Sequence, residues 1–352
     1  MKTNKNAFVA LVRAGLWESD VQLLSYGKVD YEEVMRLAEE QSVIGLVTAG
    51  LEHVLDVKVP QSDLLQFIGR ALQLEQRNLA MNQFIAEIED KMRSEGLYTL
   101  LVKGQGIAQC YERPLWRASG DVDFLFSQDN YLKAQGFLLP LSSGNKNEER
   151  YSQHLGITIG DWYVEIHGSL RTGLAARVDK VVDDVQKDVF YGGNVRSWMN
   201  GKTKVFLPSP DNDVFFVFSH FIKHFYKEGM NLRQVCDWCR LLWTYQDTID
   251  ADLLYKRLNN SGLLPEWRAF ASIAVEYLGM PVEAIPLFDA RSKKDKAKGQ
   301  QLMEFILCGY SGNKVKDTIS IARVFTWKAL CYSPSIFLNV NWLKIKERVF
   351  AR

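Results

Sequence analysis

The sequence predicts an α+β fold in which a small mixed sheet lies between two helical regions. Up to about residue 94, apolar residues recur at three- and four-residue intervals, the period of an amphipathic helix. Short runs rich in strand-forming residues follow, and helical spacing returns after residue 208. These changes of period divide the 352 residues into an N-terminal helical region (1–94), an α/β core (95–207) and a C-terminal helical domain (208–352).

The N-terminal region ends in a long helical segment. Between Ser62 and Ser94 the charged residues gather on one face and proline is absent, so we expect one helix or two. Gly96 follows and is placed to end the segment in the way that many helices end.

Short strands characterise the core, and they are expected at residues 97–102, 121–126, 157–159, 162–167 and 204–207. The first is followed by the glycine-containing turn Lys103-Gly-Gln-Gly106. Gly160-Asp161 predicts a tight hairpin between the third and fourth strands. Residues 142–149 are polar and predict a loop.

The C-terminal part begins with Pro208-Ser-Pro-Asp-Asn212, which stops the last strand and supplies a helix cap. Helical patterns then dominate, at about residues 211–227, 231–246, 250–260, 264–279 and 296–309.

Composition restricts the class of protein. The formal net charge is +1, so no overall field favours a long polyanion or an anionic membrane. No apolar run approaches the ~18–20 residues that span a bilayer, and no signal peptide is expected. The five cysteines are scattered, which favours reduced thiols. We therefore expect a cytoplasmic protein without a membrane partner.

Two carboxylates in the second strand point to chemistry. Asp121 and Asp123 alternate in a strand, so they share one face roughly 6–7 Å apart and repel each other. Aspartate is depleted in strands, and its burial costs several kcal/mol without compensation. Mg²⁺ (or Mn²⁺) is the simplest compensation, because such ions bind carboxylates together with phosphate oxygens.

Glu165 is the candidate third carboxylate. It lies among apolar residues of the predicted strand 162–167, and adjacent strands are ~4.8 Å apart, so it can reach the face of both aspartates. His167 shares that face. The alternative is that Asp-x-Asp arises by chance on an edge strand with solvated carboxylates.

The same residues carry a resemblance. The motifs are Leu101-Val-Lys-Gly104, Arg117-Ala-Ser-Gly-Asp-Val-Asp-Phe-Leu125 and Val164-Glu-Ile-His-Gly-Ser-Leu170. There the chain resembles the bacterial uncharacterised nucleotidyltransferase family of the DNA polymerase β-like superfamily, whose relatives include antibiotic nucleotidyltransferases and abortive-infection toxins. The resemblance covers about residues 95–170 and extends more loosely to Leu232-Arg-Gln-Val-Cys-Asp237.

The resemblance implies a role for each matching residue. Gly104 corresponds to the phosphate-turn glycine, Asp121 and Asp123 to the metal pair, and Glu165 to the third carboxylate. Lys103 corresponds to the lysine that precedes the glycine in the toxin-like relatives. The chain departs from the superfamily at Gln105, where a serine or second glycine is usual. Gln105 could instead donate a hydrogen bond to phosphate.

The implied reaction transfers a nucleoside monophosphate from an NTP to an acceptor hydroxyl and releases pyrophosphate. Glu165 would complete one metal site and is also a candidate general base. Lys103 or Arg117 would neutralise charge on the phosphates; for Arg117 an ordinary salt bridge is the alternative. The full set of nucleotide-binding candidates is Lys103, Gly104, Gln105, Arg117, His167, Arg233 and Asp237.

Other motifs are assigned to packing. Cys236 and Cys239 have metal-ligand spacing but lie in a helical pattern without a second pair. His220 and His224 share a helical face, and we interpret them as satisfied helix histidines rather than a metal pair. Arg233 and Asp237 could form an ordinary i, i+4 pair.

Three functions remain open from the sequence. The first is an active nucleotidyltransferase acting on a small molecule or a protein. The second is a catalytically inactive, nucleotide-binding relative. The third is a toxin-like enzyme that modifies tRNA or protein and has an antitoxin-like partner. A basic cleft would favour tRNA, and an apolar cleft would favour a small acceptor.

Overall fold

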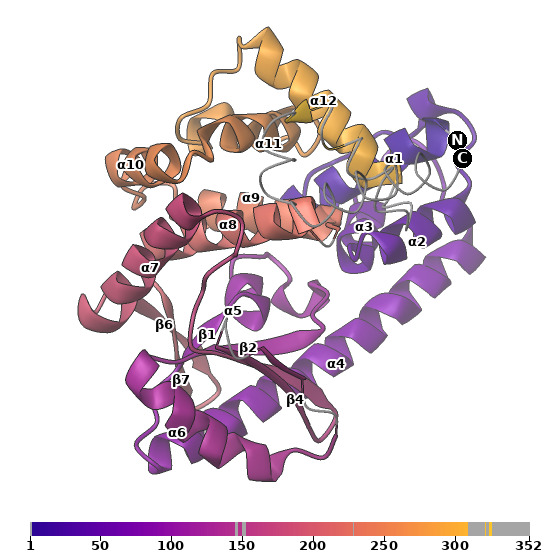
Figure 1. The fold of residues 1–352 in the computed structure, drawn as a ribbon. Coiled ribbons are helices and arrows are strands. Elements are labelled where there is room, and N and C mark those ends of the chain that lie inside the picture. Colours follow the sequence, from indigo (N-terminus) through magenta and orange to yellow (C-terminus); the bar gives the residue numbers. More distant parts are fainter. Residues whose placement is uncertain are drawn as a thin grey trace, which may run out of the picture.

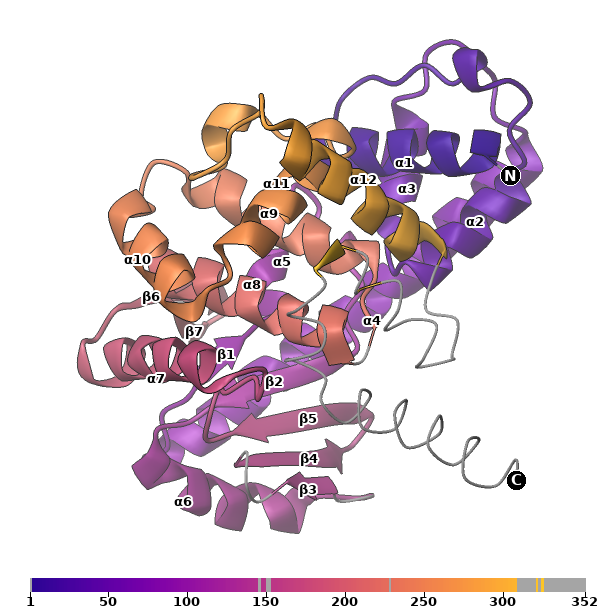
Figure 2. The same cartoon turned by 45° about the horizontal axis from the view of Figure 1, so that its top comes forward.

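The computed structural model describes residues 2–144, 147–149, 153–227, 229–308, 321, 324 and 325. The α+β prediction is confirmed: helices dominate both ends of the chain, and a small mixed sheet lies between them in sequence. Figures 1 and 2 show the N- and C-terminal helices together on one side and the sheet with helix α6 on the other. Among the described residues, no helix has the length and apolar character needed to cross a membrane.

The N-terminal helices are α1 (Lys2–Trp17), α2 (Tyr31–Glu40), α3 (Ile44–Glu52) and α4 (Gln61–Ser94). Helices α1 and α3 approach so closely that a Cβ on Gly15 would lie 1.9 Å from the Leu46 carbonyl oxygen, so only glycine fits there. The predicted stretch before Gly96 is a single helix, α4, which runs from the helical part of the molecule down along the sheet (Figure 1). Gly96 follows it with φ +69°.

The main sheet has the order β1-β2-β5-β4-β3. Its strands are β1 (Leu100–Val102), β2 (Asp121–Leu125), β3 (Asn147–Glu149), β4 (His154–Ile159) and β5 (Trp162–His167). Strands β2 and β5 are parallel and the other neighbouring pairs are antiparallel. The Gly160-Asp161 hairpin is confirmed between β4 and β5.

One local prediction for the core was wrong, and one helix was not predicted. Residues 147–149 form the edge strand β3 instead of belonging to a loop, because an edge strand pairs on one side and needs no apolar alternation. Helix α7 (Ala176–Tyr191) lies after residue 170, where no element was predicted even though its buried valines recur at helical spacing. A second hairpin, β6 (Val195–Asn200) and β7 (Thr203–Pro208), extends the single strand expected there.

The predicted C-terminal helices are confirmed within a few residues at each end. They are α8 (Pro210–Lys227), α9 (Leu232–Tyr245), α10 (Ala251–Ser261), α11 (Leu264–Glu276) and α12 (Lys293–Cys308). Phe218, Trp238 and Trp267 pack edge to face or tilted in their core. Cys236 and Cys239 are buried free thiols in the same core, as predicted.

The buried apolar residues form two clusters that determine where the site lies. One joins the N-terminal helices α1–α3 to the C-terminal helices α8–α12. The other lies under the main sheet, between its strands, α4, α6 (Gln128–Leu138) and β7. The N-terminal and C-terminal helical regions thus share one core. The domain boundaries at residues 94 and 207 remain a prediction. The polar residues described next lie where the two clusters meet.

Candidate active site

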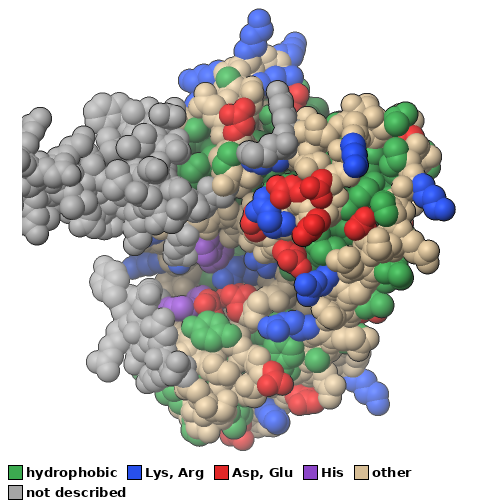
Figure 3. Space-filling view, turned by 90° about the vertical axis from the view of Figure 1, so that its right-hand side faces the viewer, with side chains coloured by type: hydrophobic (Ala, Val, Ile, Leu, Met, Phe, Trp, Pro, Cys, Tyr) green, Lys and Arg blue, Asp and Glu red, His purple; other side chains and the backbone are tan. Residues whose placement is uncertain are grey.

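A cavity of about 340 Å³ lies between one face of the main sheet and the helices α8 and α9. Every predicted site residue except Gln105 lines it. The space-filling view shows the hollow crossing one face of the molecule, with basic, acidic and histidine side chains gathered inside it (Figure 3). The sequence thus predicted side chains that the fold brings together from four separate segments.

Asp121, Asp123 and Glu165 meet because of the register of two parallel strands. Asp123 on β2 is the direct partner of Glu165 on β5, and Asp121 lies two residues earlier on the same face. One carboxylate oxygen from each residue lies within 4.8 Å of the others. The Asp123 charge and then burial raise the pKa of Asp121. This crowded negative charge is the donor set that a divalent cation requires.

Lys103 neutralises part of that charge. Val102, the last residue of β1, pairs with Asp123. Lys103 is the next residue, so it begins the turn after β1 beside the carboxylates. The Lys103 Nζ atom lies 2.6 Å from Asp123 Oδ1. Burial opposes the ammonium form, but Asp123, Glu165 and Asp121 outweigh it and raise the pKa of Lys103. Lys103 also has φ +59° and ψ −145°, a backbone conformation that favours glycine.

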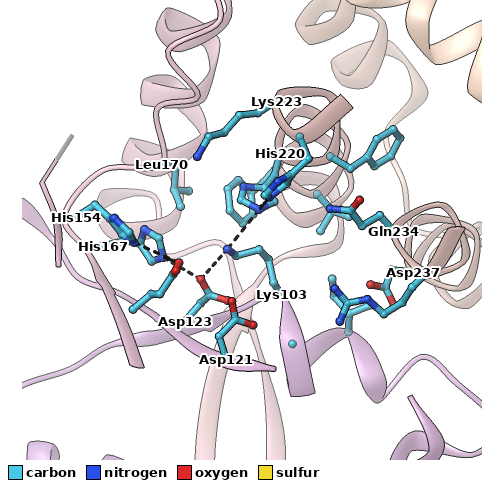
Figure 4. Close-up of a pocket in the computed structure, with 18 of the residues that line it drawn as sticks. Lys103, Asp121, Asp123, His154, His167, Leu170, His220, Lys223, Gln234 and Asp237 are labelled. Carbon is cyan, nitrogen blue, oxygen red and sulfur yellow. Dashed lines mark hydrogen bonds and ion pairs between the residues drawn. The ribbon is translucent and has the colours of Figure 1, made fainter. Parts of the chain in front are cut away.

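Two histidines hold the other side of the carboxylate cluster. His167 Nε2 lies 2.8 Å from Asp123 Oδ1 and 3.3 Å from Glu165 Oε2. His154 Nε2 lies 3.2 Å from the same Glu165 oxygen, and its ring stacks on His167 with centroids 4.8 Å apart. In Figure 4 both histidines lie on one side of Asp123, opposite Lys103 and His220.

These contacts bear on the two roles expected for Glu165. Burial alone would raise the pKa of Glu165, but the adjacent His154 and His167 side chains and the charge of Lys103 lower it well below its usual range. A carboxylate with so low a pKa is a good cation ligand and a weak general base. Hydrogen bonds to Asp123 and Glu165 raise the pKa of His167 despite its burial and the nearby Lys103 charge.

Arg117 and Asp237 are committed to each other. Arg117 Nε and Nη2 each donate to one Asp237 oxygen at 2.7 Å, and both side chains are buried. The remaining Arg117 nitrogen donates to Ala118 O and Ser119 Oγ, and the Tyr111 hydroxyl donates to Asp237. Arg117 therefore forms a salt bridge, the alternative considered from the sequence, and this pair joins α9 to the segment before β2. Both residues also line the cavity.

Arg233 differs from Arg117 because one of its donors is uncommitted. Its Nη1 donates to Ala118 O at 2.7 Å, whereas its Nε is buried without a hydrogen-bond partner among the described residues. Burial and then the nearby Arg117 charge lower the pKa of Arg233. The i, i+4 pair with Asp237 is replaced by the Arg117–Asp237 pair. Arg233 is therefore a cavity-lining cation suited to an anion.

The side chain of Gln105 does not have the expected position. It is buried and donates to Asn78 Oδ1 of α4 at 2.8 Å and to Ser119 Oγ at 3.2 Å, outside the cavity lining. The expectation that it donates to phosphate is corrected for this reason. Gly104 begins the short helix α5 (Gly104–Ala108) with φ +41° and lines the cavity.

Helix α8 supplies cavity residues that the sequence did not assign to the site. His220, Lys223 and His224 all line the cavity, so the two histidines are more than helix packing. His220 Nε2 lies 3.4 Å from Lys103 Nζ and 2.9 Å from His224 Nε2. Burial, Lys103 and His224 lower the pKa of His220 well below 6.5, so its imidazole is neutral at pH 7.

Comparison with known proteins identifies one family. A family model described as an uncharacterised nucleotidyltransferase matches residues 27–279. The match includes the whole cavity and extends into the helices on both sides of the core. No curated protein and no solved structure matches the chain.

Proposed function

Since the chain belongs to the uncharacterised nucleotidyltransferase family, we propose that it transfers a nucleoside monophosphate from an NTP to an acceptor hydroxyl and releases pyrophosphate. The family match supports nucleotidyl transfer as the general activity. The observation that carries the finer proposal is the convergence of Asp121, Asp123 and Glu165 in a cavity that also contains Lys103 and Arg233.

The carboxylates fit a divalent cation. Their oxygens converge within 4.8 Å, and the raised pKa of Asp121 reports negative charge that the described side chains leave undercompensated. We assign Asp121, Asp123 and Glu165 as ligands for Mg²⁺ or Mn²⁺. A bound divalent ion would supply charge neutralisation for the triphosphate and the leaving pyrophosphate.

The basic side chains bind the phosphates. Lys103 stays protonated and lies at the carboxylate cluster, so it can move from Asp123 to a phosphate oxygen once the cluster is neutralised. Arg233 lines the cavity from α9 and adds a second positive charge there. Arg117 keeps the segment before β2 in place through Asp237 rather than binding phosphate itself. Charge-assisted hydrogen bonds of this kind are about twice as strong as neutral ones.

The proposed transfer forms one bond to the α-phosphorus and breaks another. The acceptor oxygen forms a bond to the α-phosphorus, and the bond from that phosphorus to the oxygen bridging to the β-phosphate breaks, so that pyrophosphate leaves. We assign the acceptor's proton to the neutral imidazole of His220, which lines the cavity. A triphosphate adds negative charge that offsets Lys103, which raises the pKa of His220 and makes it a better base.

Two observations bear on the alternatives. The departure at Gln105 favours an inactive relative only if that side chain meets the phosphates, but it lies outside the cavity, and all three carboxylates are present. The cavity wall mixes basic side chains with Phe216, Val217 and Phe221 of α8, so it favours neither tRNA nor a small apolar acceptor by composition.

Nucleotide binding separates these possibilities. Each of the four NTPs is added to the protein with and without Mg²⁺, and the unfolding midpoint and pyrophosphate release are measured. Ligand at ~100 times its dissociation constant adds about 2.7 kcal/mol, a shift of a few degrees in a chain of this size. An active enzyme shows an Mg²⁺-dependent shift and pyrophosphate release, and an inactive relative shows the shift alone. Absence of any shift at millimolar NTP and Mg²⁺ contradicts the proposal.

A further inference from the structure

Three nitrogen and oxygen donors converge beside the carboxylate triad. His154 Nε2 and His167 Nε2 lie 3.2 Å and 3.3 Å from the same atom, Glu165 Oε2, and all three donors lie within 4.8 Å of one another. We propose that His154, His167 and Glu165 form a second metal site, which takes a first-row transition metal such as Zn²⁺ in preference to Mg²⁺.

The sheet itself arranges these donors. His154 on β4 is the direct partner of His167 on β5, so their side chains leave the sheet on the same face. Glu165 lies two residues before His167 and shares that face. The three donors therefore come from two paired strands, and little chain entropy is lost in bringing them together. Metal sites on such rigid elements hold their geometry well.

The distances fit one ion. Zinc binds histidine nitrogen and carboxylate oxygen at about 2.0–2.2 Å, which places the donors of a tetrahedral site roughly 3.3 Å apart. The separations of His154 Nε2 and His167 Nε2 from Glu165 Oε2 have this length, and the two nitrogens lie within 4.8 Å of each other. All three residues also line the cavity, so a fourth coordination position faces its interior and can take water or a ligand oxygen.

The donor types set the selectivity. Imidazole nitrogen suits Zn²⁺, Co²⁺ and other first-row metals, whereas Mg²⁺ favours oxygen ligands. Lys103, which would repel a cation, lies on the other side of Asp123 from both histidines (Figure 4). The site takes no ligand from a nucleotide or from the two aspartates, and a metal would replace the contact of His167 Nε2 with Asp123. It therefore goes beyond the proposed reaction. Glu165 is the residue that both sites share.

Metal titration of the full chain, stripped of metal and without nucleotide, tests the proposal. Zn²⁺ binding is measured by calorimetry, and Co²⁺ binding by its visible absorption. We expect one Zn²⁺ that millimolar Mg²⁺ does not displace. His154→Gln and His167→Gln should each raise the Zn²⁺ dissociation constant about 100-fold or more, because loss of residues that merely support a ligand already costs ~10–100-fold.

Two control variants make the test specific. His53→Gln also removes an imidazole, from a hydrogen bond with Glu18 outside the cavity, and should leave Zn²⁺ binding unchanged. Asp121→Asn should retain Zn²⁺ binding while losing nucleotidyl transfer. This variant therefore distinguishes a failure of the proposed zinc site from a failure of the proposed function. Thermal unfolding confirms that each variant is folded. The proposal is overturned by Zn²⁺ affinity unchanged in folded His154→Gln, by equal loss in His53→Gln, or by displacement with Mg²⁺.

Discussion

Asp123 and Glu165 are direct partners across the parallel strands β2 and β5. This register creates the carboxylate cluster, because successive side chains on a strand point to opposite faces and a slip of one residue would turn Glu165 away. The alternation also keeps Asp121 and His167 on the same face as this pair. The chemistry of the cavity therefore depends on the pairing of two strands that are distant in sequence.

The two aspartates should differ in their effect on stability, although neither variant should transfer nucleotides. Asp123 raises the pKa of Asp121, so ionised Asp121 is repelled and Asp121→Asn should leave the metal-free protein equally or more stable above pH 4. This gain should disappear at lower pH, where Asp121 is protonated in both states. Asp123→Asn removes the partner of Lys103 and should cost about 1–3 kcal/mol. Urea unfolding at pH 3 and 7 measures both; a larger loss for Asp121→Asn contradicts the assignment.

Lys103 should carry backbone strain. Its φ of +59° with ψ −145° favours glycine, so Lys103→Gly should be more stable than Lys103→Ala by about 1–3 kcal/mol. Lys223 lies within α8 and is the matched control, since there glycine should be the less stable by about 1 kcal/mol. Denaturant midpoints of the four variants give the comparison. The same sign at both positions would refute strain at Lys103.

The buried pair of Arg117 and Asp237 should be structural. Arg117→Met leaves the Asp237 carboxylate buried without its ion-pair partner and should cost about 3–5 kcal/mol. The double variant Arg117→Met/Asp237→Leu should recover much of this loss. Arg36→Met, which breaks exposed ion pairs with Glu33 and Glu40, should leave the free energy of unfolding nearly unchanged. Equal, small costs for Arg117→Met and Arg36→Met would show that the buried pair is dispensable.

His220 should titrate well below pH 6.5 in the folded protein. Lys103 contributes to this lowered pKa, so Lys103→Met should raise it. The folded pKa of His220 lies below the unfolded value of about 6.5, so its contribution to the free energy of unfolding is complete above pH 6.5. This contribution is progressively lost as the pH falls toward the folded pKa. His220→Gln should remove this acid-side loss. NMR titration of the imidazole signals tests the account, and titration near pH 6.5 that is insensitive to Lys103→Met would contradict it.

Much of the carboxylate site could be predicted from local pattern. Alternating aspartates and an isolated glutamate conflict with the strands that contain them, and such conflicts occur at functional sites. His154 was missed because the strand was expected to begin at residue 157. The signal was present nevertheless: counting outward from the Gly160-Asp161 turn places His154 opposite His167.

Other features needed the tertiary structure. The helical spacing of His220 and His224 is the same whether their face meets a core or a cavity, so the sequence could not place them. The orientation of Gln105 depends on Asn78 of α4, which lies far away in sequence. For α7 the buried valines Val178, Val182, Val185 and Val189 did carry a readable helical period, so that helix could have been predicted.

Transfer of label from NTPs tests the central claim most directly. The protein is incubated with Mg²⁺, cell extract and each NTP, labelled either at the α- or at the γ-phosphate. Nucleotidyl transfer predicts that an acceptor gains the α-label and that the γ-label leaves as pyrophosphate. Asp121→Asn should abolish both, whereas Arg36→Met should retain them. Transfer of the γ-label to the acceptor that depends on the added protein, or full α-transfer by Asp121→Asn, would contradict the account.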